Sequence, residues 1–537
     1  MSDQTPTSEP AEKPAGPSRR ALLGAAVAAG AAPFVLPGRA EAVVPGPIDP
    51  AYEIGPAEPP LTPWERPSLP QADARRLMPR TRSAPGDGER LTAAALPFTF
   101  VVHRFPVREV PLELRPYYRT TAVSLTDSGH HDAKGVRMYL RDGRLYNHPV
   151  AQAQYGLTLL ESYRITGNIA YLDRARQHAQ RLWDTRVVRS NAWFYPYPFT
   201  FQLHGNKEIY RPPWYSMMAQ GQVLSFFVRI YQVTGNANWA TAAHNTFNSF
   251  RLAPAAGKPW GVYVVNNHLL FEEYPDPARI RGDRTYNGHT FAAFGLYDYW
   301  VWTRNDDALL LLQGAMTTTR DWNASYRSAG WRSKYCLTHG TDSGHYHDVH
   351  MGQFAQLYAI CGDDYFAQFV DTYYADFPPS AGLGTVRLSA GGHTGVKFNS
   401  AGQVTARKTL RLNAVSSAPS SERQKIRTQP GIWYSISGGG LSGYQLQESP
   451  PSRYQLGAYA GVSYLLNRPA AITQAAPRAY QVDRAGTMTA VTTTYQPGDS
   501  VTIDARAVLN AARHVRLADG PYAGRWLGVA AVTFNVS

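Results

Sequence analysis

Two adjacent carboxylates and a tyrosine stand together at residues 272–275, which read EEYP and lie within NNHLLFEEYPDPARI, just after the apolar run GVYVV. Carboxylates and phenols can take and return protons when their surroundings bring their pKa values near the working pH. The same four letters are also typical of an acidic, solvated turn at the end of a strand. Which interpretation holds depends on what else lies nearby, and therefore on the elements that position this segment.

A second group of candidate residues lies in the stretch WRSKYCLTHGTDSGHYHDVH, residues 331–350. It supplies Tyr335 and Tyr346, which in isolation would be half-buried packing residues. It also supplies His347 and His350, whose i, i+3 spacing suits a metal ion, but no third ligand is evident and a structural hydrogen bond is favoured. We therefore predict no metal site and no cofactor.

A phenol needs help to act as a base, because its ordinary pKa of about 10 keeps it protonated at neutral pH. Nearby cations would lower that pKa and would also attract an anionic substrate. A solvated loop is the alternative explanation for the run of arginines that follows EEYP. The basic side chains near the two segments are Arg279, Arg281, Arg284, Arg332 and Lys334.

A repeat in the middle of the chain predicts how these segments are held. Thr166-Gly167-Asn168 separates two helix-periodic stretches, and Thr234-Gly235-Asn236 and Thr303-Arg304-Asn305 do the same 68 and 69 residues further on. Cys361-Gly362-Asp363 is a related break 58 residues later. Glycine or a polar residue suits the end of one helix, and Asn or Asp caps the next. Each unit is therefore predicted to be a helical hairpin.

The first helix of each hairpin is apolar on nearly every face, as in MMAQGQVLSFFVRIYQV, which indicates burial. The second helices have one polar face, as in YLDRARQHAQRLW. An inner ring of helices inside an outer ring follows, which is an incomplete α/α toroid; an ordinary helical bundle is the alternative. The predicted inner helices are 149–165, 213–233, 287–302 and 346–360, and the outer ones are 169–185, 237–252, 305–322 and 364–376.

The repeat also predicts where the chemistry lies. The inner helices run in parallel, so their N-terminal ends share one rim. EEYP leads into the third inner helix and residues 331–345 lead into the fourth, so both segments are predicted on this rim. Helix N-termini carry partial positive charge, which favours an anionic ligand. The side chains expected there also include Gln152, Gln220, His289, Tyr346 and His347.

Five ordered motifs between about residues 146 and 376 resemble the D-glucuronyl C5-epimerases. They are YNHPVAQAQYGL, PWYSMMAQGQVLSFFVRIYQVTG, NNHLLFEEYP, NGHTFAAFGLYD and YHDVHMGQFAQL. Enzymes of that family convert glucuronate to iduronate in heparosan and heparan chains. The resemblance implies an α/α toroid whose cleft abstracts and returns the C5 proton of D-glucuronate in an acidic, heparosan-like polymer.

The resemblance further implies that Glu273, Tyr274, Tyr335 and Tyr346 match the family's catalytic glutamate and tyrosines. Thr338 stands where an arginine follows the family's tyrosine, and the segment between Tyr335 and Tyr346 is shorter than in the animal enzymes. The β-domain that the animal enzymes carry before the helical domain is missing. The residues expected to bind substrate are Gln152, Trp214, Tyr215, Gln220, Arg279, Asn287, Arg332, His347 and His350.

Composition agrees with a globular protein that has an anionic partner. Of 537 residues 44% are apolar, and 53 Lys and Arg outnumber 40 Asp and Glu. The charges do not form runs and no nucleic-acid motif is present, so an acidic polysaccharide is favoured over nucleic acid. The aromatic share of 12% suits stacking on sugar rings. The oligomeric state stays open, with a homodimer as one possibility.

The N-terminus has the features of an export signal. Arg19 and Arg20 precede the run ALLGAAVAAGAAPFVL, and Ala40-Glu41-Ala42 offers a cleavage site. We expect twin-arginine export of a secreted, periplasmic or cell-wall-associated protein, with no stable membrane insertion after signal removal. Cys336 and Cys361 could form a disulfide or stay as buried thiols.

The whole chain is predicted to be an α+β multidomain protein with the toroid at its centre. The C-terminal third alternates and is punctuated by glycine, which predicts strands. Residues 452–467, SRYQLGAYAGVSYLLN, are expected to form a helix that closes the ring. The predicted divisions are a signal peptide 1–42, a Pro-rich linker 43–92, a β-rich segment 93–145, the toroid 146–380, a β-rich region with the closing helix 381–468, and a β-module 469–537.

Two other functions compete with a uronate C5-epimerase. A polysaccharide lyase removes the same C5 proton but expels the 4-linked sugar, so the sequence does not separate the two. A non-catalytic surface protein that binds anionic glycan would need the charge and the aromatic residues but not the proton transfer. The identity of the polymer also stays open.

Overall fold

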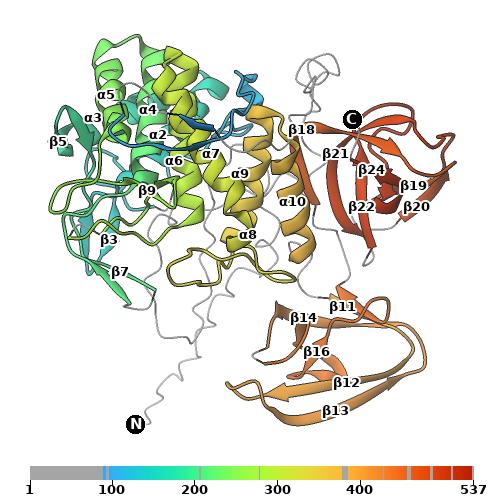
Figure 1. Ribbon diagram of the computed structural model, residues 1–537. Coiled ribbons are helices and arrows are strands. Elements are labelled where there is room, and N and C mark those ends of the chain that lie inside the picture. Colours follow the sequence, from blue (N-terminus) through green and yellow to red (C-terminus); the bar gives the residue numbers. More distant parts are fainter. Residues whose placement is uncertain are drawn as a thin grey trace, which may run out of the picture.

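The computed structural model describes residues 89–91, 96–127, 129–204, 207–276, 278–377, 385–426, 428–455, 461–483, 488–509 and 512–534. The predicted signal peptide and nearly all of the predicted linker lie outside these residues. A helical domain fills one side of the molecule and two β-sheet regions follow it in the chain (Figure 1).

Four helical hairpins build the helical domain. The first helices α2, α4, α6 and α9 pack side by side in that order, and each second helix packs on the outside of its own partner. The first helices are buried along most of their length, whereas the second helices bury only one face. This arrangement confirms the incomplete α/α toroid. The hairpins are α2 (Pro149–Thr166) with α3 (Ile169–Thr185), α4 (Met217–Thr234) with α5 (Ala237–Asn248), α6 (Tyr286–Thr303) with α7 (Asp306–Asp321), and α9 (Tyr346–Cys361) with α10 (Asp364–Asp376).

The repeated breaks end the inner helices and cap the outer helices, as the sequence predicts. Gly167, Gly235 and Gly362 end the inner helices with φ between 66° and 70°, a left-handed conformation that glycine adopts without a Cβ clash. Arg304 takes the same region with φ 56°. The next residue then caps the outer helix with its side chain: Asn168, Asn236, Asn305 and Asp363 each accept a hydrogen bond from a backbone N–H of the following turn.

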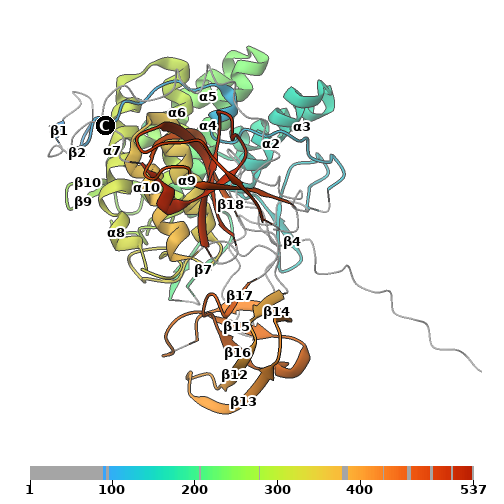
Figure 2. The same cartoon turned by 90° about the vertical axis from the view of Figure 1, so that its right-hand side faces the viewer.

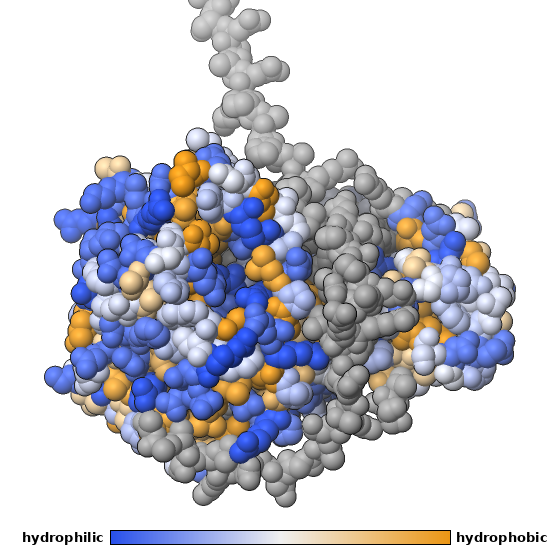
Figure 3. Space-filling model, turned by 90° about the horizontal axis from the view of Figure 1, so that it is seen from above, coloured by the Kyte–Doolittle hydropathy of each residue, from blue (hydrophilic) through white to orange (hydrophobic). Residues whose placement is uncertain are grey.

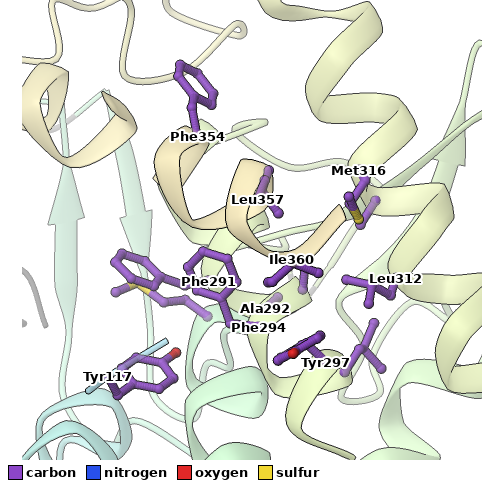
Figure 4. Close-up of a cluster of buried hydrophobic side chains, with 14 of the residues drawn as sticks. Tyr117, Phe291, Ala292, Phe294, Tyr297, Leu312, Met316, Phe354, Leu357 and Ile360 are labelled. Atoms are coloured by element: carbon purple, nitrogen blue, oxygen red, sulfur yellow. The ribbon is translucent and has the colours of Figure 1, made fainter. Parts of the chain in front are cut away.

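Glycine also sets how closely two inner helices approach. A Cβ on Gly221 of α4 would lie 2.4 Å from the Cα of Ala292, and one on Gly295 of α6 would lie 2.3 Å from the carbonyl oxygen of Gly221. The backbones of α4 and α6 therefore touch. Further along, α6, α7 and α9 enclose a cluster of aromatic and aliphatic side chains, including Phe291 and Leu357 (Figure 4).

The segment predicted to be β-rich, 93–145, is largely irregular over its described residues 96–127 and 129–145, which corrects the prediction. The short strand β2 (Phe100–Val102) pairs with β1 (Glu89–Leu91), and β3 (Tyr139–Arg141) pairs with β4 (Arg144–Tyr146). Between them the chain lies across the helices. Its alternating apolar residues are buried, but its backbone bonds to helical residues: the N–H of Val110 donates to the Tyr297 hydroxyl, and the Gln356 amide donates to the carbonyl of Leu114.

Three hairpins and a short helix surround the N-terminal ends of the inner helices. They are β5 (Val187–Arg189) with β6 (Ala192–Phe194), β7 (Phe201–Leu203) with β8 (Glu208–Tyr210), β9 (Val262–Val265) with β10 (His268–Phe271), and α8 (Asn323–Tyr326). Strand β10 ends directly before EEYP. Figure 1 shows β3, β7 and α8 below the main body of the helices.

The first β-region is one seven-stranded antiparallel sheet that lies below the helical domain in both views (Figures 1 and 2). It touches the helical domain through cations on rings: Lys425 lies 4.9 Å from the ring centre of Trp331, and Arg423 lies 4.5 Å from that of Phe377. Its strands are β11 (Thr385–Leu388), β12 (Gly391–Phe398), β13 (Val404–Leu412), β14 (Ser416–Gln424), β15 (Trp433–Ile436), β16 (Gln445–Gln447) and β17 (Arg453–Gln455).

The predicted closing helix at 452–467 is wrong. Its described residues 453–455 and 461–467 lie in strands β17 and β18 (Gly461–Ile472), and β18 packs against α9 and α10. Residues 462–466 are buried on both faces of the strand. A run of that kind has no alternation, so its pattern cannot be told from that of a buried helix.

Strand β18 belongs to a second seven-stranded sheet, which the view of Figure 2 places in front of the helices. Arg468 in β18 fixes the sheet to α10, because its guanidinium bonds the carboxylates of Asp364 and Asp371. The other strands are β19 (Arg478–Val482), β20 (Met488–Thr492), β21 (Ser500–Leu509), β22 (Ala512–Leu517), β23 (Trp526–Gly528) and β24 (Val532–Thr533).

The cysteines, the helix lengths and the surface complete the description of the fold. Cys336 and Cys361 are both buried thiols and form no disulfide. Among the described helices, none combines the length and the apolar character that crossing a bilayer requires. Seen from above, the surface mixes hydrophilic residues with smaller groups of hydrophobic ones (Figure 3).

Candidate active site

The start of helix α6 holds the two candidate segments together. The backbone N–H of Tyr286 donates to the carbonyl of Tyr335, and Thr285 and Cys336 form an antiparallel bridge. On its other side Tyr335 donates its N–H to the carbonyl of Thr341. These backbone contacts therefore fix the loop that carries Tyr335 to the residues that follow EEYP, although Tyr274 and Tyr335 are 61 residues apart in the chain.

The three predicted tyrosines gather in one place. The hydroxyl oxygens of Tyr274 and Tyr335 lie 3.2 Å apart, within hydrogen-bond distance. The rings of Tyr335 and Tyr346 meet edge to face with centres 4.9 Å apart. The sequence placed these residues on one rim, and the structure brings them into contact.

Glu273 lies against the first turn of α6. A Cβ added to Gly288 would lie 2.2 Å from Oε2 of Glu273 and 2.6 Å from Cβ of Glu273. Only glycine at position 288 therefore leaves room for the Glu273 side chain. The unpaired N–H groups of a helix N-terminus stabilise a negative charge placed there. The position therefore favours a carboxylate at the start of α6.

The neighbouring Glu272 has a different environment. Its side chain is completely buried, and its Oε2 accepts a hydrogen bond from the backbone N–H of Arg284. Burial raises the pKa of Glu272 to about 8, against the opposing effect of that hydrogen bond. Its backbone also pairs with Gly261 and Met217. Glu272 therefore ties the loop of residues 281–284 to the strand end.

Aromatic rings form a wall behind Tyr274. The ring of Phe201 stacks on it at 5.5 Å, and that of Trp214 lies 6.1 Å away. Trp214, a predicted substrate contact, donates its indole N–H to the carbonyl of Phe199 and stacks on Tyr197. Its main role in this structure is to support Tyr274.

Other predicted substrate contacts serve the fold. Tyr215 packs in a separate small cluster with Phe194, and Gln220 bonds the backbone of Trp193 and Tyr195. The amide of Gln152 donates to Asn147. These residues are near the predicted rim but are engaged in positioning hairpins.

The two histidines of α9 are also engaged. Nδ1 of His347 accepts from the N–H of Ser333, so its Nε2 carries the proton that it donates to the carbonyl of Tyr373. Nδ1 of His350 lies 2.8 Å from the hydroxyl of Ser333. The preference for structural hydrogen bonds agrees with these contacts. Asn287 is fully buried at the start of α6, where its backbone carbonyl accepts a hydrogen bond from the side-chain amide of Gln353.

Three of the predicted cations, those of Arg281, Arg332 and Lys334, contact other groups in the described structure, and the side chain of Arg279 is exposed. Arg281 pairs with Asp276, and the backbone N–H of Arg279 bonds the same carboxylate while its side chain is exposed. The guanidinium of Arg332 lies 4.7 Å from the ring centre of Phe377, and Lys334 donates to the carbonyl of Ser325. These contacts put the positive charge around the tyrosine cluster rather than on its hydroxyls.

Burial limits access to the cluster. Glu273, Tyr274, Tyr335 and Tyr346 expose only 3%, 2%, 7% and 6% of their surfaces. Only small parts of these four side chains are therefore open to a ligand in this conformation.

Sequence reasoning missed a second cluster beside Tyr335. His204, Asp283, Cys336 and His339 point their ligand atoms at one another, all within 4.8 Å. They come from three separate segments, and only the spacing Cys-x-x-His between 336 and 339 is visible locally. These are the side chains of the described structure that could hold a metal ion.

The fold is an incomplete α/α toroid, and the candidate site is a cluster of three phenols at one end of it, with Glu273 packed against the first turn of α6. The resemblance to the D-glucuronyl C5-epimerases is confirmed over residues 189–375, which match the family model described as the D-glucuronyl C5-epimerase C-terminus. That family consists of carbohydrate epimerases.

Similarity to individual proteins is weaker. An uncharacterised protein of Methanocaldococcus jannaschii is 22% identical over 173 residues, which cover 32% of this chain and 54% of that protein. Cellobiose 2-epimerase from Bacillus thermoamylovorans aligns with 45% of this chain and 64% of its own, at 15% identity and a TM-score of 0.33. A family 76 α-mannanase from Bacteroides thetaiotaomicron aligns with 46% and 62%, at 11% identity and a TM-score of 0.32. The chain thus spans about half of the curated relative and less than two thirds of these solved chains.

Proposed function

We propose that the protein is a polysaccharide uronate C5-epimerase that removes and returns the C5 proton of D-glucuronate in an acidic, heparosan-like polymer. The observation that carries the proposal is the meeting of Tyr274, Tyr335 and Tyr346 beside Glu273. It occurs inside the segment that matches the epimerase family.

The reaction needs a base on one face of the sugar and an acid on the other. One group takes the C5 proton, the electron pair passes into the adjacent carboxylate, and a second group donates a proton to the opposite face. We assign these exchanges to Glu273 and the three phenols. The hydrogen bond between the hydroxyls of Tyr274 and Tyr335 would stabilise either one as a phenolate, since a hydrogen bond to the charged form favours ionisation.

Substrate binding is assigned to the basic residues around the cluster. Arg279 is exposed and Arg332 half-buried, so both guanidinium groups can turn toward a uronate carboxylate. A guanidinium can hold a carboxylate with two parallel hydrogen bonds and oppose the charge that develops there in the transition state. Lys425 of the first β-sheet adds a cation near Trp331.

Solvent exchange is the direct test. The full chain is incubated with a panel of uronate polymers in heavy water, and the C5 position is followed by NMR. Deuterium at C5 with unchanged chain length is the expected result for at least one polymer. Glu273→Gln should lower the exchange rate by about 10²- to 10⁴-fold, the usual contribution of a general acid or base.

The same assay separates the competing functions. Chain cleavage with a rise in ultraviolet absorbance from unsaturated uronate would replace the epimerase with a lyase. Binding to a polymer without any exchange by the wild-type protein would leave a glycan-binding protein and would end the catalytic proposal.

The cellular setting is part of the proposal. Arg19 and Arg20 before the apolar run support twin-arginine export. An exported enzyme would meet polysaccharide outside the cytoplasm. Fusing residues 1–42 to a reporter that is active only after export would test this, with Arg19→Lys and Arg20→Lys together expected to retain the reporter inside.

A further inference from the structure

We propose that His204, Asp283, Cys336 and His339 bind one divalent transition-metal ion of the zinc class, which fixes the loop that carries Tyr335. Two imidazoles, a carboxylate and a thiol converge here from three segments: the turn after β7, the residues before α6, and the loop after Tyr335. The C5 proton exchange proposed above is assigned to Glu273 and the three phenols and uses none of these four side chains.

The distances suit a tetrahedral ion. Ligand atoms at zinc bond lengths of about 2.0–2.3 Å are separated by roughly 3.3–3.7 Å in a tetrahedron. Sγ of Cys336 lies 3.4 Å from Nε2 of His204 and 3.9 Å from Nδ1 of His339. Asp283 bonds both rings, at 2.7 Å to His204 and 2.5 Å to His339. Inserting the ion requires these two contacts to open by about one ångström or less.

The donor set selects the metal. A thiolate and two imidazoles favour zinc and its transition-metal neighbours over Mg²⁺ and Ca²⁺, which take oxygen ligands. Asp283 and Cys336 are completely buried, and the side chains of His204 and His339 expose only 9% and 16%. Four protein ligands in a closed setting are typical of a structural zinc site rather than a catalytic one with an open position.

An outer carboxylate lies close to one of the ligands. Oε1 of Glu208 lies 4.0 Å from Nε2 of His339, the ring nitrogen that faces away from the cluster. Histidines that bind metals usually present their second nitrogen to such a group, which fixes the ring and raises its basicity. The hydroxyl of Tyr210 then lies 2.9 Å from Glu208 and 3.0 Å from the carbonyl of Tyr274.

The ion would therefore act as a clamp on the tyrosine cluster. Cys336 follows Tyr335 directly, and the ring of His204 meets the ring of Tyr335 edge to face at 5.9 Å. The path through Glu208 and Tyr210 reaches Tyr274. These residues are positioning residues: the bound ion would hold two phenols at the separation that their hydrogen bond needs.

Metal binding is measured without any substrate. The untagged full chain is dialysed against metal-free buffer and assayed by mass spectrometry, and we expect about one zinc ion per chain. The stripped protein is then titrated with Co²⁺, whose tetrahedral thiolate complexes absorb strongly in the visible and near-ultraviolet. We expect a d–d spectrum of tetrahedral cobalt together with a sulfur-to-cobalt charge-transfer band.

Matched variants locate the site. Cys336→Ala should remove the charge-transfer band and weaken Co²⁺ binding by at least about 100-fold, because even an outer partner of a metal ligand contributes 10- to 100-fold. Cys361→Ala removes the other buried thiol, which bonds the Leu357 carbonyl in α9. This variant should keep the charge-transfer band and the wild-type affinity for Co²⁺. Asp283→Asn should keep the band but weaken binding.

The outcomes are decisive in either direction. Wild-type protein that binds Co²⁺ no more tightly than Cys336→Ala, or without the sulfur band, would overturn the proposal and leave a hydrogen-bonded His–Asp–His array. Circular dichroism of the stripped variants checks that they fold. Because these readouts need no sugar, the metal site can fail while the epimerase proposal stands, and the reverse.

Discussion

The two ends of the inner helices are built in opposite ways. At the C-terminal ends the same solution recurs, a left-handed residue followed by a capping side chain, at Gly167, Gly235, Arg304 and Gly362. At the N-terminal ends every helix has different neighbours. One begins beside Glu273 and another begins with Tyr346 itself. The C-terminal ends, where one motif recurs, stabilise the hairpins. The N-terminal ends, which differ from helix to helix, carry the candidate catalytic residues.

The largest contrast is expected between two tyrosines at opposite ends. Tyr274→Phe removes a hydroxyl that lies 3.2 Å from that of Tyr335, and should lower C5 exchange by about 10²- to 10⁴-fold. Tyr231→Phe changes a half-buried tyrosine in the last turn of α4 and should leave exchange within about twofold. Polymer binding should change by less than about tenfold in both, since each loses one hydroxyl. Equal exchange rates in the two variants would remove the distinction between the ends.

A matched pair of glycines gives a smaller contrast. Gly288→Ala would drive a Cβ to 2.2 Å from Oε2 of Glu273, so the carboxylate must shift. A displacement of about 1 Å at a reacting group can cost roughly 10²-fold in rate. We expect a loss of that order in kcat.

Gly235→Ala is the matched substitution at the C-terminal end of an inner helix, α4. It meets no atom within 4 Å, but its φ of +66° forces alanine into the left-handed region. That conformation costs about 1–2 kcal/mol of unfolding free energy and should leave kcat unchanged. Calorimetry and exchange kinetics on both variants measure the two effects. A Gly235→Ala enzyme with greatly reduced kcat would contradict the division of roles.

The smallest effect is expected within EEYP itself. Burial raises the pKa of Glu272 to about 8 from an ordinary value of 4.5, so the folded protein holds a proton that the unfolded chain releases. Its contribution to stability is complete below about pH 4.5 and is lost as the pH rises through 8. Glu272→Gln should therefore gain unfolding free energy relative to wild type as the pH increases, on the order of 1 kcal/mol or more at pH 8. A difference that is the same at pH 5 and pH 8 would show that the buried carboxyl does not titrate as described.

Much of the helical domain can be predicted from the sequence, because the residues that begin, end and bury each helix lie within that helix or next to it in the chain. Each break carries its own signal, a left-handed residue followed by an N-cap, and each inner helix is apolar all round. The placement of Tyr274 and Tyr346 at one end follows from counting residues back from those breaks. The family motifs point to the same residues.

What the sequence could not provide depends on contacts between distant segments. The sequence predicts a helix at strand β18 because residues 462–466 are all buried and show no alternation; α9 and α10 pack against this strand. Gln220 and His347 were expected to face substrate, but each is used by a neighbouring hairpin or loop. The cluster around Asp283 depends on a turn near residue 204 that no spacing along the chain connects to Cys336.

Deuterium exchange at C5 is the measurement that tests the central claim most directly. The wild-type chain in heavy water should label the glucuronate residues of an acidic polymer at C5 without shortening it, and Tyr274→Phe should label them about 10²-fold more slowly or less. Labelling by Tyr274→Phe at the wild-type rate would contradict the account, because the phenols would then meet at the end of the toroid without moving the proton.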